Sequence, residues 1–238
     1  MLGKIIPVTR RNKDEGEKPF WISFADLMSA LMVMFLLVMS VALLAITKNV
    51  SEAEKRQAER VHEIDALWAR IEQTAEQHPG VSVDRSRNVI DFGERAHFDT
   101  GSSRLNTEQV EYLSGFVSEI LGLVRDDLAQ RWLKRIVVEG FADQRGDYLL
   151  NLNLSLQRSE RVLCSLLAPP RELQHKLSAE EMEQVRALFL VGGYSFNSAK
   201  KSLEESRRIE LRLEFYGIDE AHAQTEDIPR NDFGQCRI

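Results

Sequence analysis

The hydrophobic pattern of the chain is dominated by a nearly uninterrupted apolar run from Phe20 to Ile46. Asp26 is the only charged residue in this run. About 25 helical residues extend about 38 Å, which is enough to cross a bilayer core of about 30 Å. A cleaved signal peptide would have an apolar region of only about 7–15 residues and a small-residue cleavage site. The pattern therefore predicts a transmembrane helix over residues 20–46.

The charges that flank the apolar run predict its orientation. Basic residues precede the run, whereas the flank that follows it mixes both signs. Because cytoplasmic flanks carry an excess of Lys and Arg, we expect residues 1–19 in the cytoplasm and the larger C-terminal part in the periplasm. The expected location is the cell inner membrane, crossed once. The preceding basic residues are Lys4, Arg10, Arg11, Lys13 and Lys18.

Asp26 requires an explanation, because a carboxylate at the centre of a membrane helix costs about 2.5–3.5 kcal/mol and somewhat less near an end. One interpretation is that Asp26 reaches to the interface or caps the helix. However, it shares a face with Ser29, Ala30 and Val33, and small residues suit a packed helix interface better than lipid. A carboxylate held away from bulk water can bind and release a proton, so we favour an ion-carrying role.

Residues 47–80 continue the helical pattern beyond the membrane. They are rich in Glu, Ala, Arg and Gln, with no Gly or Pro before Pro79. About 30 helical residues would reach about 45 Å, which suits a stalk between membrane and cell wall. We expect a periplasmic helical stalk or linker that pairs with a second copy of the chain, although a solvated single helix fits the same pattern. Its apolar residues at helical spacing are Val61, Ile64, Leu67 or Trp68, and Ile71.

Residues 81–216 change to a mixture of short strands and amphipathic helices, followed by a tail over 217–238. Strands separated by helices predict an α+β sandwich in the order β-α-β-α-β-β. A capping box from Ser178 to Glu181 predicts a further short helix after Pro169-Pro170. The predicted strands lie within 81–98 and at 136–138, 189–192 and 209–215, and the predicted helices at 107–124 and 154–167.

Composition excludes several function classes. The net charge of -6 gives no support to nucleic-acid binding. The two cysteines, Cys164 and Cys236, are too few for a disulfide framework, and the five histidines show no metal-ligand pairing. We find no nucleophile elbow, and pairs such as Glu94 with Asp99 read as solvated loop charges. The chain is therefore not expected to be an enzyme, nor to hold a metal or cofactor.

The C-terminal part resembles the OmpA-like peptidoglycan-binding domains. The family's motif has a G-H-T-D run, a glycine shortly after it, and then N-x-x-L-S-x-x-R. Two further stretches, at 98–105 and 206–210, also match, and the resemblance covers about 135 residues, from Val81 to Phe215. The matching residues are Gly140, Asp143, Gly146, Asn151, Leu154, Ser155 and Arg158 in the motif, with Thr100 and Gly101 in the earlier stretch.

The resemblance implies a binding site for peptidoglycan. Its residues would be Asp143, Asn151, Leu154 and Arg158, with Thr100 and Gly101. An anion and a cation on facing elements suit a zwitterion such as diaminopimelate, because Arg can hold a carboxylate with two hydrogen bonds and Asp accepts from an ammonium group. A plain salt bridge between Asp143 and Arg158 would explain the same pair without a ligand.

This sequence departs from the family at several positions. Phe141 replaces the usual His, Ala142 the usual Thr and Ser206 the usual Asn, which puts the affinity in doubt. The insertion after Leu167 and the tail exceed the family core. Cys236 of the tail could pair with Cys164, because the periplasm permits disulfides.

The membrane segment resembles that of the MotB-type subunits of ion-driven motors, and its A-D-L-M-S-A-L-M run begins at Ala25. The preceding context, from Pro19, is most similar to the MotB-like subunits of Zorya anti-phage defence systems. The resemblance implies a homodimer inside a ring of MotA-like (ZorA-like) membrane subunits, expected in five copies. It also implies that Asp26 carries an ion, expected to be H⁺, while peptidoglycan holds the dimer still.

Two other readings stay open at this point. A passive wall tether would explain the C-terminal domain but not Asp26. A flagellar stator subunit would explain both, and the choice of a defence motor rests on the family likeness alone.

Overall fold

The computed structural model describes residues 18–222, 233–234 and 236, which form two compact units over residues 1–56 and 57–238. The first helix, α1 (Lys18–Glu76), is the one helix of the described chain that is long and apolar enough to cross a membrane, and its most apolar window has a mean hydropathy of 2.7. The basic residues from Lys4 to Lys13, which carried the predicted orientation, lie outside the described residues.

Helix α1 is continuous because no Gly or Pro interrupts the chain between Phe20 and His78. In the apolar part, the hydroxyl groups of Ser29, Ser40 and Thr47 each donate to the carbonyl oxygen four residues earlier, at 2.7–2.8 Å. Such bonds satisfy a hydroxyl group where the surroundings offer no water. The helix ends before Pro79, and Gly80 turns the chain with a φ of 96°.

The structure places the start of the globular unit earlier than the predicted boundary at residue 80. That unit starts at Gln57, so residues 57–80 of the expected stalk, more than two thirds of it, belong to the domain. Leu67, Trp68 and Ile71 are each 2% exposed and lie in the domain's hydrophobic core. The apolar stripe that we assigned to pairing between copies is therefore covered by the chain's own domain.

The domain is built on a five-stranded sheet in the order β1-β2-β5-β3-β4. Only β3 and β4 pair in parallel, and the other neighbours are antiparallel. The α+β class is confirmed, and the two strand-like pieces before the first domain helix form a hairpin, β1 with β2. The strands are β1 (Ser82–Asp84), β2 (Val89–Asp91), β3 (Leu133–Gly140), β4 (Phe189–Gly193) and β5 (Ile209–Phe215).

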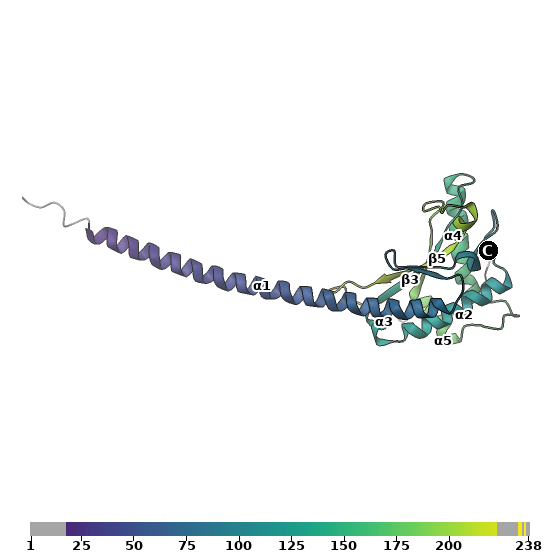
Figure 1. Cartoon of the computed structure of the whole chain (residues 1–238), viewed down its shortest axis with the longest axis horizontal. Coiled ribbons are helices and arrows are strands. Elements are labelled where there is room, and N and C mark those ends of the chain that lie inside the picture. The colour runs from purple at the N-terminus through teal and green to yellow at the C-terminus, as the bar shows by residue number, and fades with distance from the viewer. Residues whose placement is uncertain (1–17, 223–232, 235, 237–238) are drawn as a thin grey trace, which may run out of the picture. The chain divides into compact units, whose positions relative to one another are not determined.

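The domain helices begin at well-formed caps. Asn106 and Ser178 each make a capping box, as predicted for Ser178. The helix predicted from Leu154 begins six residues earlier, at Tyr148, because the Asp147 carboxylate accepts from the Leu150 N–H at 2.8 Å. The helices, seen in part in Figure 1, are η1 (Gly93–Ala96), α2 (Thr107–Val124), α3 (Asp127–Trp132), α4 (Tyr148–Leu167), α5 (Ala179–Leu188) and α6 (Leu203–Ser206).

One face of the sheet forms the core with the helices. Strand alternation and the register place Ile136, Val138, Leu211 and Leu213 on this face, each at most 1% exposed. Helix α4 lies directly on β3 at Gly140, where an added Cβ would overlap the carbonyl oxygen of Ser155. This close approach brings the start of α4 next to the loop that leaves β3.

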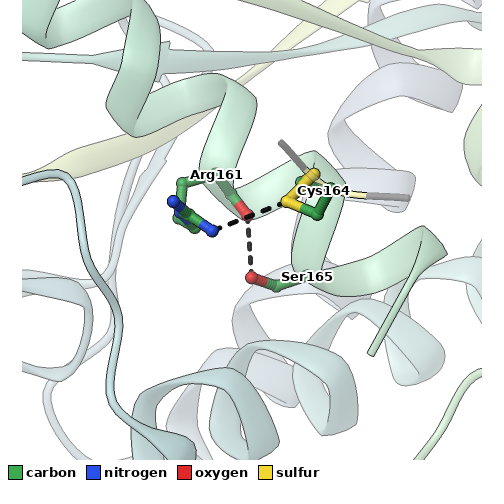
Figure 2. The surroundings of a disulfide bond; sticks show 4 residues. Arg161, Cys164 and Ser165 are labelled. Atoms are coloured by element: carbon green, nitrogen blue, oxygen red, sulfur yellow. Dashed lines mark hydrogen bonds between the residues drawn. A yellow bond between two sulfur atoms is a disulfide. The ribbon is translucent and has the colours of Figure 1, made fainter. Parts of the chain in front are cut away.

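The C-terminal tail is attached to α4 by a disulfide between Cys164 and Cys236, the pair considered from the sequence (Figure 2). The two Cα atoms lie 5.6 Å apart, and the two cysteines are 72 positions apart along the chain. Arg161, one turn earlier on α4, donates to the Cys236 sulfur at 3.5 Å, and its own carbonyl accepts from Ser165 at 2.8 Å.

Candidate functional site

A cavity of about 350 Å³ lies where the start of α4 meets the loops after β3 and after η1. All six residues proposed from the sequence as peptidoglycan-binding line it, although they come from three separate segments. Four more residues, for which the sequence gave no site role, complete the wall. The lining residues are Thr100, Gly101, Asp143, Arg145, Leu150, Asn151, Asn153, Leu154, Gln157 and Arg158.

The loop after β3 is held in place by α4. Asn151 is 3% exposed and donates from its side-chain amide to the Arg145 carbonyl at 2.8 Å. Gly146 has a φ of 91°, a conformation that favours glycine, and this turn returns the chain to the helix. Asn151 therefore shapes the cavity chiefly by fixing the backbone around Asp143.

Arg158 has a different environment from the one expected. We expected a guanidinium group free to point at a ligand, but the residue is fully buried. Its guanidinium donates to the carbonyl oxygens of Ser102 at 2.9 Å, Phe141 at 2.7 Å and Asp99 at 3.1 Å. These bonds use three of the five N–H groups of the guanidinium, and the residue lines the cavity.

The surroundings of Arg158 also affect its charge. Burial, and secondarily the nearby Arg207, lowers the pKa of Arg158 to about 10, with Asp143 opposing. The side chain therefore stays positive at neutral pH. It ties the β3 and η1 loops together and gives the cavity a fixed cation.

Asp143 is paired with two arginines other than Arg158. Arg145 donates to it from Nη2 at 2.7 Å and from its backbone N–H at 3.0 Å, and Arg207 donates from Nη1 at 3.1 Å. Burial opposes ionisation, yet these hydrogen bonds, those of Arg145 first, lower the pKa of Asp143 to about 2. The simple Asp143–Arg158 salt bridge considered from the sequence is replaced by this three-residue cluster.

Arg207 is the buried arginine of this cluster. It is 6% exposed, donates to the Phe98 carbonyl at 2.8 Å and lies 3.2 Å from the His97 Nε2 atom. An arginine can only donate, so His97 accepts here and is neutral. Burial, with Arg207 next in importance, lowers the pKa of His97 in agreement with this arrangement.

Sequence reasoning gave no role to Arg145 or Arg207. Arg207 lay within the matching stretch 206–210, where only the resemblance itself was noted. Arg145 lies between Asp143 and Gly146, at a position that the family motif leaves open. The available signal was a basic residue two positions after the site carboxylate, on the same tight loop.

Two residues that depart from the family pattern, Phe141 and Ser206, contact neighbouring residues of the domain. Phe141 stacks on Tyr194, with ring centroids 5.4 Å apart, and on the Arg208 guanidinium at 4.1 Å. Ser206 accepts from the Lys200 N–H at 2.9 Å. Neither residue lines the cavity, so both substitutions alter the support of the site and leave its walls unchanged.

The cavity can bind a small polar ligand with two opposite charges. Arg158 supplies a fixed cation and Asp143 an ionised carboxylate, while Leu150 and Leu154 add apolar wall. Among the residues that the structure describes, no group of three or more His, Cys, Asp and Glu side chains could hold a metal ion.

Asp26, the second candidate site, lies in the apolar part of α1. It is exposed along with its neighbours in this single chain. Ser29 follows one turn later on the same face. Its hydroxyl group donates to the Ala25 carbonyl at 2.8 Å, so its proton is already used within the helix. Asp26 is therefore the one acidic side chain that the helix offers within the apolar run of 20–46.

The fold and these two sites define a protein with one candidate membrane helix, which carries an acidic residue, and one α+β domain with a charged cavity. No family model matches the sequence. The chain is 44% identical over 229 residues to the Zorya protein ZorB of Escherichia coli O139:H28, covering 96% of this chain and 93% of that protein. The chain belongs to the family of the Zorya protein ZorB.

Solved structures give more distant likenesses. The periplasmic domain of Helicobacter pylori MotB is 16% identical, with a TM-score of 0.42, over 61% of this chain and 85% of that one. The cell wall anchor of the T6SS from Pseudomonas aeruginosa is 18% identical, with a TM-score of 0.39, over 62% of this chain and 96% of that one.

Proposed function

We propose that this chain is the wall-anchored subunit of a proton-driven inner-membrane motor that acts in anti-phage defence. The observation that carries the proposal is the 44% identity to a Zorya ZorB protein over nearly the whole of both chains, membrane helix included. In this proposal the N-terminus is cytoplasmic and the α+β domain is periplasmic. The chain acts as a homodimer inside a ring of five MotA-like subunits.

The charged cavity is proposed to bind the peptide stem of peptidoglycan. Diaminopimelate, the stem's zwitterionic residue, would place its carboxylate at the two unused N–H groups of Arg158 and its ammonium group at Asp143. The apolar walls of Leu150 and Leu154 would contact the methylene chain between the two charges. Support comes from the six motif residues, which the fold gathers around this one cavity.

Asp26 is proposed to carry protons between the two sides of the membrane. In turn, each copy's carboxylate binds a proton, loses its charge and changes its contacts with the surrounding ring. A unit charge that crosses 100 mV releases about 2.3 kcal/mol, which can drive one step of the ring around the anchored pair. An anchor is required because a free pair would turn with the ring.

The anchoring part is tested by binding to isolated peptidoglycan sacculi. Arg158→Ala is a poor test, since it removes three hydrogen bonds that hold the fold. Asn153 is exposed at the cavity wall, so Asn153→Trp obstructs the cavity and leaves the core unchanged. We expect the full-length chain in detergent to co-sediment with sacculi, and Asn153→Trp to reduce the bound fraction at least tenfold.

The matched control is Glu160→Trp, which places the same side chain two helical turns further along α4, exposed and outside the cavity. This variant should bind sacculi as the unaltered chain does. Equal binding by the Asn153→Trp variant would show that the cavity is not the wall contact and would refute this part of the proposal.

A further inference from the structure

Arg145 occupies the position at Asp143 where a ligand's ammonium group would bind. Its Nη2 atom donates to the Asp143 carboxylate at 2.7 Å and to the Thr100 hydroxyl at 3.0 Å. Both partners line the cavity. With Arg207 on the same Oδ2 atom and the Arg145 backbone N–H on Oδ1, the carboxylate already accepts a hydrogen bond at each oxygen.

Because Oδ2 accepts from both guanidinium groups, a ligand cation can bind this oxygen only if one of them moves away. Arg207 is held in the interior, with a side chain that is 7% exposed and further bonds to the carbonyl oxygens of Phe98 and Leu203. The Arg145 side chain is 51% exposed, and within the part of the chain that the structure describes it bonds only to Asp143 and Thr100. Arg145 is therefore the group that can leave.

We propose that Arg145 is an internal competitor for the ligand: its guanidinium occupies Asp143 when no ligand is bound, and the ligand's ammonium group displaces it. This inference rests on the proposed function of the cavity as a peptidoglycan-stem site. It adds a residue that sets the affinity, to which the family motif assigns no role. Asp143 stays ionised throughout, because the buried Arg207 remains bonded to its Oδ2 atom when Arg145 leaves.

The displacement has a small cost, which fixes the size of the expected effect. Ion pairs of a half-exposed side chain contribute up to about 1 kcal/mol, which corresponds to about a fivefold change in affinity. Removing the Arg145 charge should therefore tighten the binding of an ammonium-bearing ligand about two- to fivefold. If Arg145 instead bonded to the ligand's carboxylate, its removal would weaken binding, so the two roles predict opposite signs.

The experiment is isothermal titration of the full-length chain in detergent with the tripeptide L-Ala–γ-D-Glu–meso-diaminopimelate. We expect Arg145→Gln to lower the Kd about two- to fivefold and Arg145→Lys to leave it within twofold, because a lysine also pairs with Asp143. Arg171→Gln, an equal change of net charge at an exposed position outside the cavity, should leave the Kd unchanged. An unchanged or raised Kd for Arg145→Gln overturns the inference.

A second probe, the same tripeptide acetylated on its side-chain amine, isolates the ammonium group. Arg145→Gln should not tighten binding of this probe, and equal tightening of both probes would also overturn the inference. Asp143→Asn and Asn153→Trp separate this inference from the proposed function. If both lose binding while Arg145→Gln shows no gain, only the role of Arg145 fails. If both bind as the unaltered chain does, or if the unaltered chain itself does not bind the tripeptide, the cavity is not the stem site and both proposals fail.

Discussion

Arg158 and Asp143 show how far a motif determines the chemistry of single residues. The spacing of the N-x-x-L-S-x-x-R stretch predicted that Arg158 and Asp143 would meet, and they line one cavity. The motif could not predict that Arg158 bonds to three backbone carbonyls or that Asp143 pairs with Arg145 and Arg207. Arg207 and the carbonyl partners of Arg158 come from loops whose course depends on the whole fold, so sequence spacing carries no signal for them. Only Arg145, two positions after Asp143 on the same loop, left a signal in the sequence.

The ionised state of Asp143 should make the stability of the domain depend on pH. Its pKa is about 2 in the folded chain, below the ordinary value of 3.8, so its charge stabilises the fold above about pH 4 and this contribution is lost as the pH falls toward 2. A shift of this size corresponds to about 2 kcal/mol. Asp143→Asn should therefore lower the free energy of unfolding by about 2 kcal/mol at pH 7, and the difference should shrink below pH 4.

Urea unfolding of the full-length chain in detergent, followed by tryptophan fluorescence, measures this difference because Trp68 is buried. Asp65→Asn, at an exposed position, serves as the control and should change stability by less than about 0.5 kcal/mol at any pH. A difference for Asp143→Asn that stays constant from pH 7 to pH 3 would contradict the assigned charge cluster.

At the scale of elements, the boundary between membrane helix and domain is where the sequence reading was least accurate. The strands and the helices α2, α4 and α5 followed from apolar periodicity and caps, and β5 begins and ends where predicted, whereas the short helices η1, α3 and α6 were not predicted. For α1, the sequence predicted the helix correctly. It assigned the apolar stripe to a contact with a second copy, whereas the chain's own domain covers Leu67, Trp68 and Ile71. Periodicity shows that a helix has an apolar stripe, and it cannot show whether another copy or the chain's own sheet covers that stripe.

Trp68 tests this assignment. Its ring contacts Phe215 of β5 edge to face, with centroids 6.0 Å apart, and it is 2% exposed. Trp68→Ala should destabilise the domain by about 3–5 kcal/mol, the usual cost of removing a buried aromatic side chain. Val61→Ala, seven residues earlier and 46% exposed, should cost less than about 1 kcal/mol.

The readout is thermal unfolding of the full-length chain by circular dichroism at two protein concentrations tenfold apart. A domain that covers Trp68 by itself should show the same loss at both. If the effect of Trp68→Ala grew or vanished with concentration, Trp68 would lie in an interface between copies, as the sequence alone suggested.

For the whole molecule, the proposed function needs both sites, the acidic residue in the membrane helix and the charged cavity in the domain. A carboxylate in a membrane helix can move protons, and a charged cavity in a domain can hold a cell-wall peptide, but neither alone converts ion flow into motion. The sequence suggested this combination through its resemblance to MotB-type subunits. The 44% identity to a Zorya ZorB protein shows the family to which the chain belongs. The ring of partner subunits has no trace in this single chain, so it stays a prediction.

The most direct test of this account is the efficiency of phage plating on cells that express the whole defence system with either Asp26→Asn or Asn153→Trp in this chain. The account predicts that both variants lose protection to the level of cells without the system, while Glu160→Trp keeps it, at equal amounts of membrane-bound protein. Full protection by Asp26→Asn, or by Asn153→Trp chains that no longer bind sacculi, would contradict a proton-driven motor anchored to the wall.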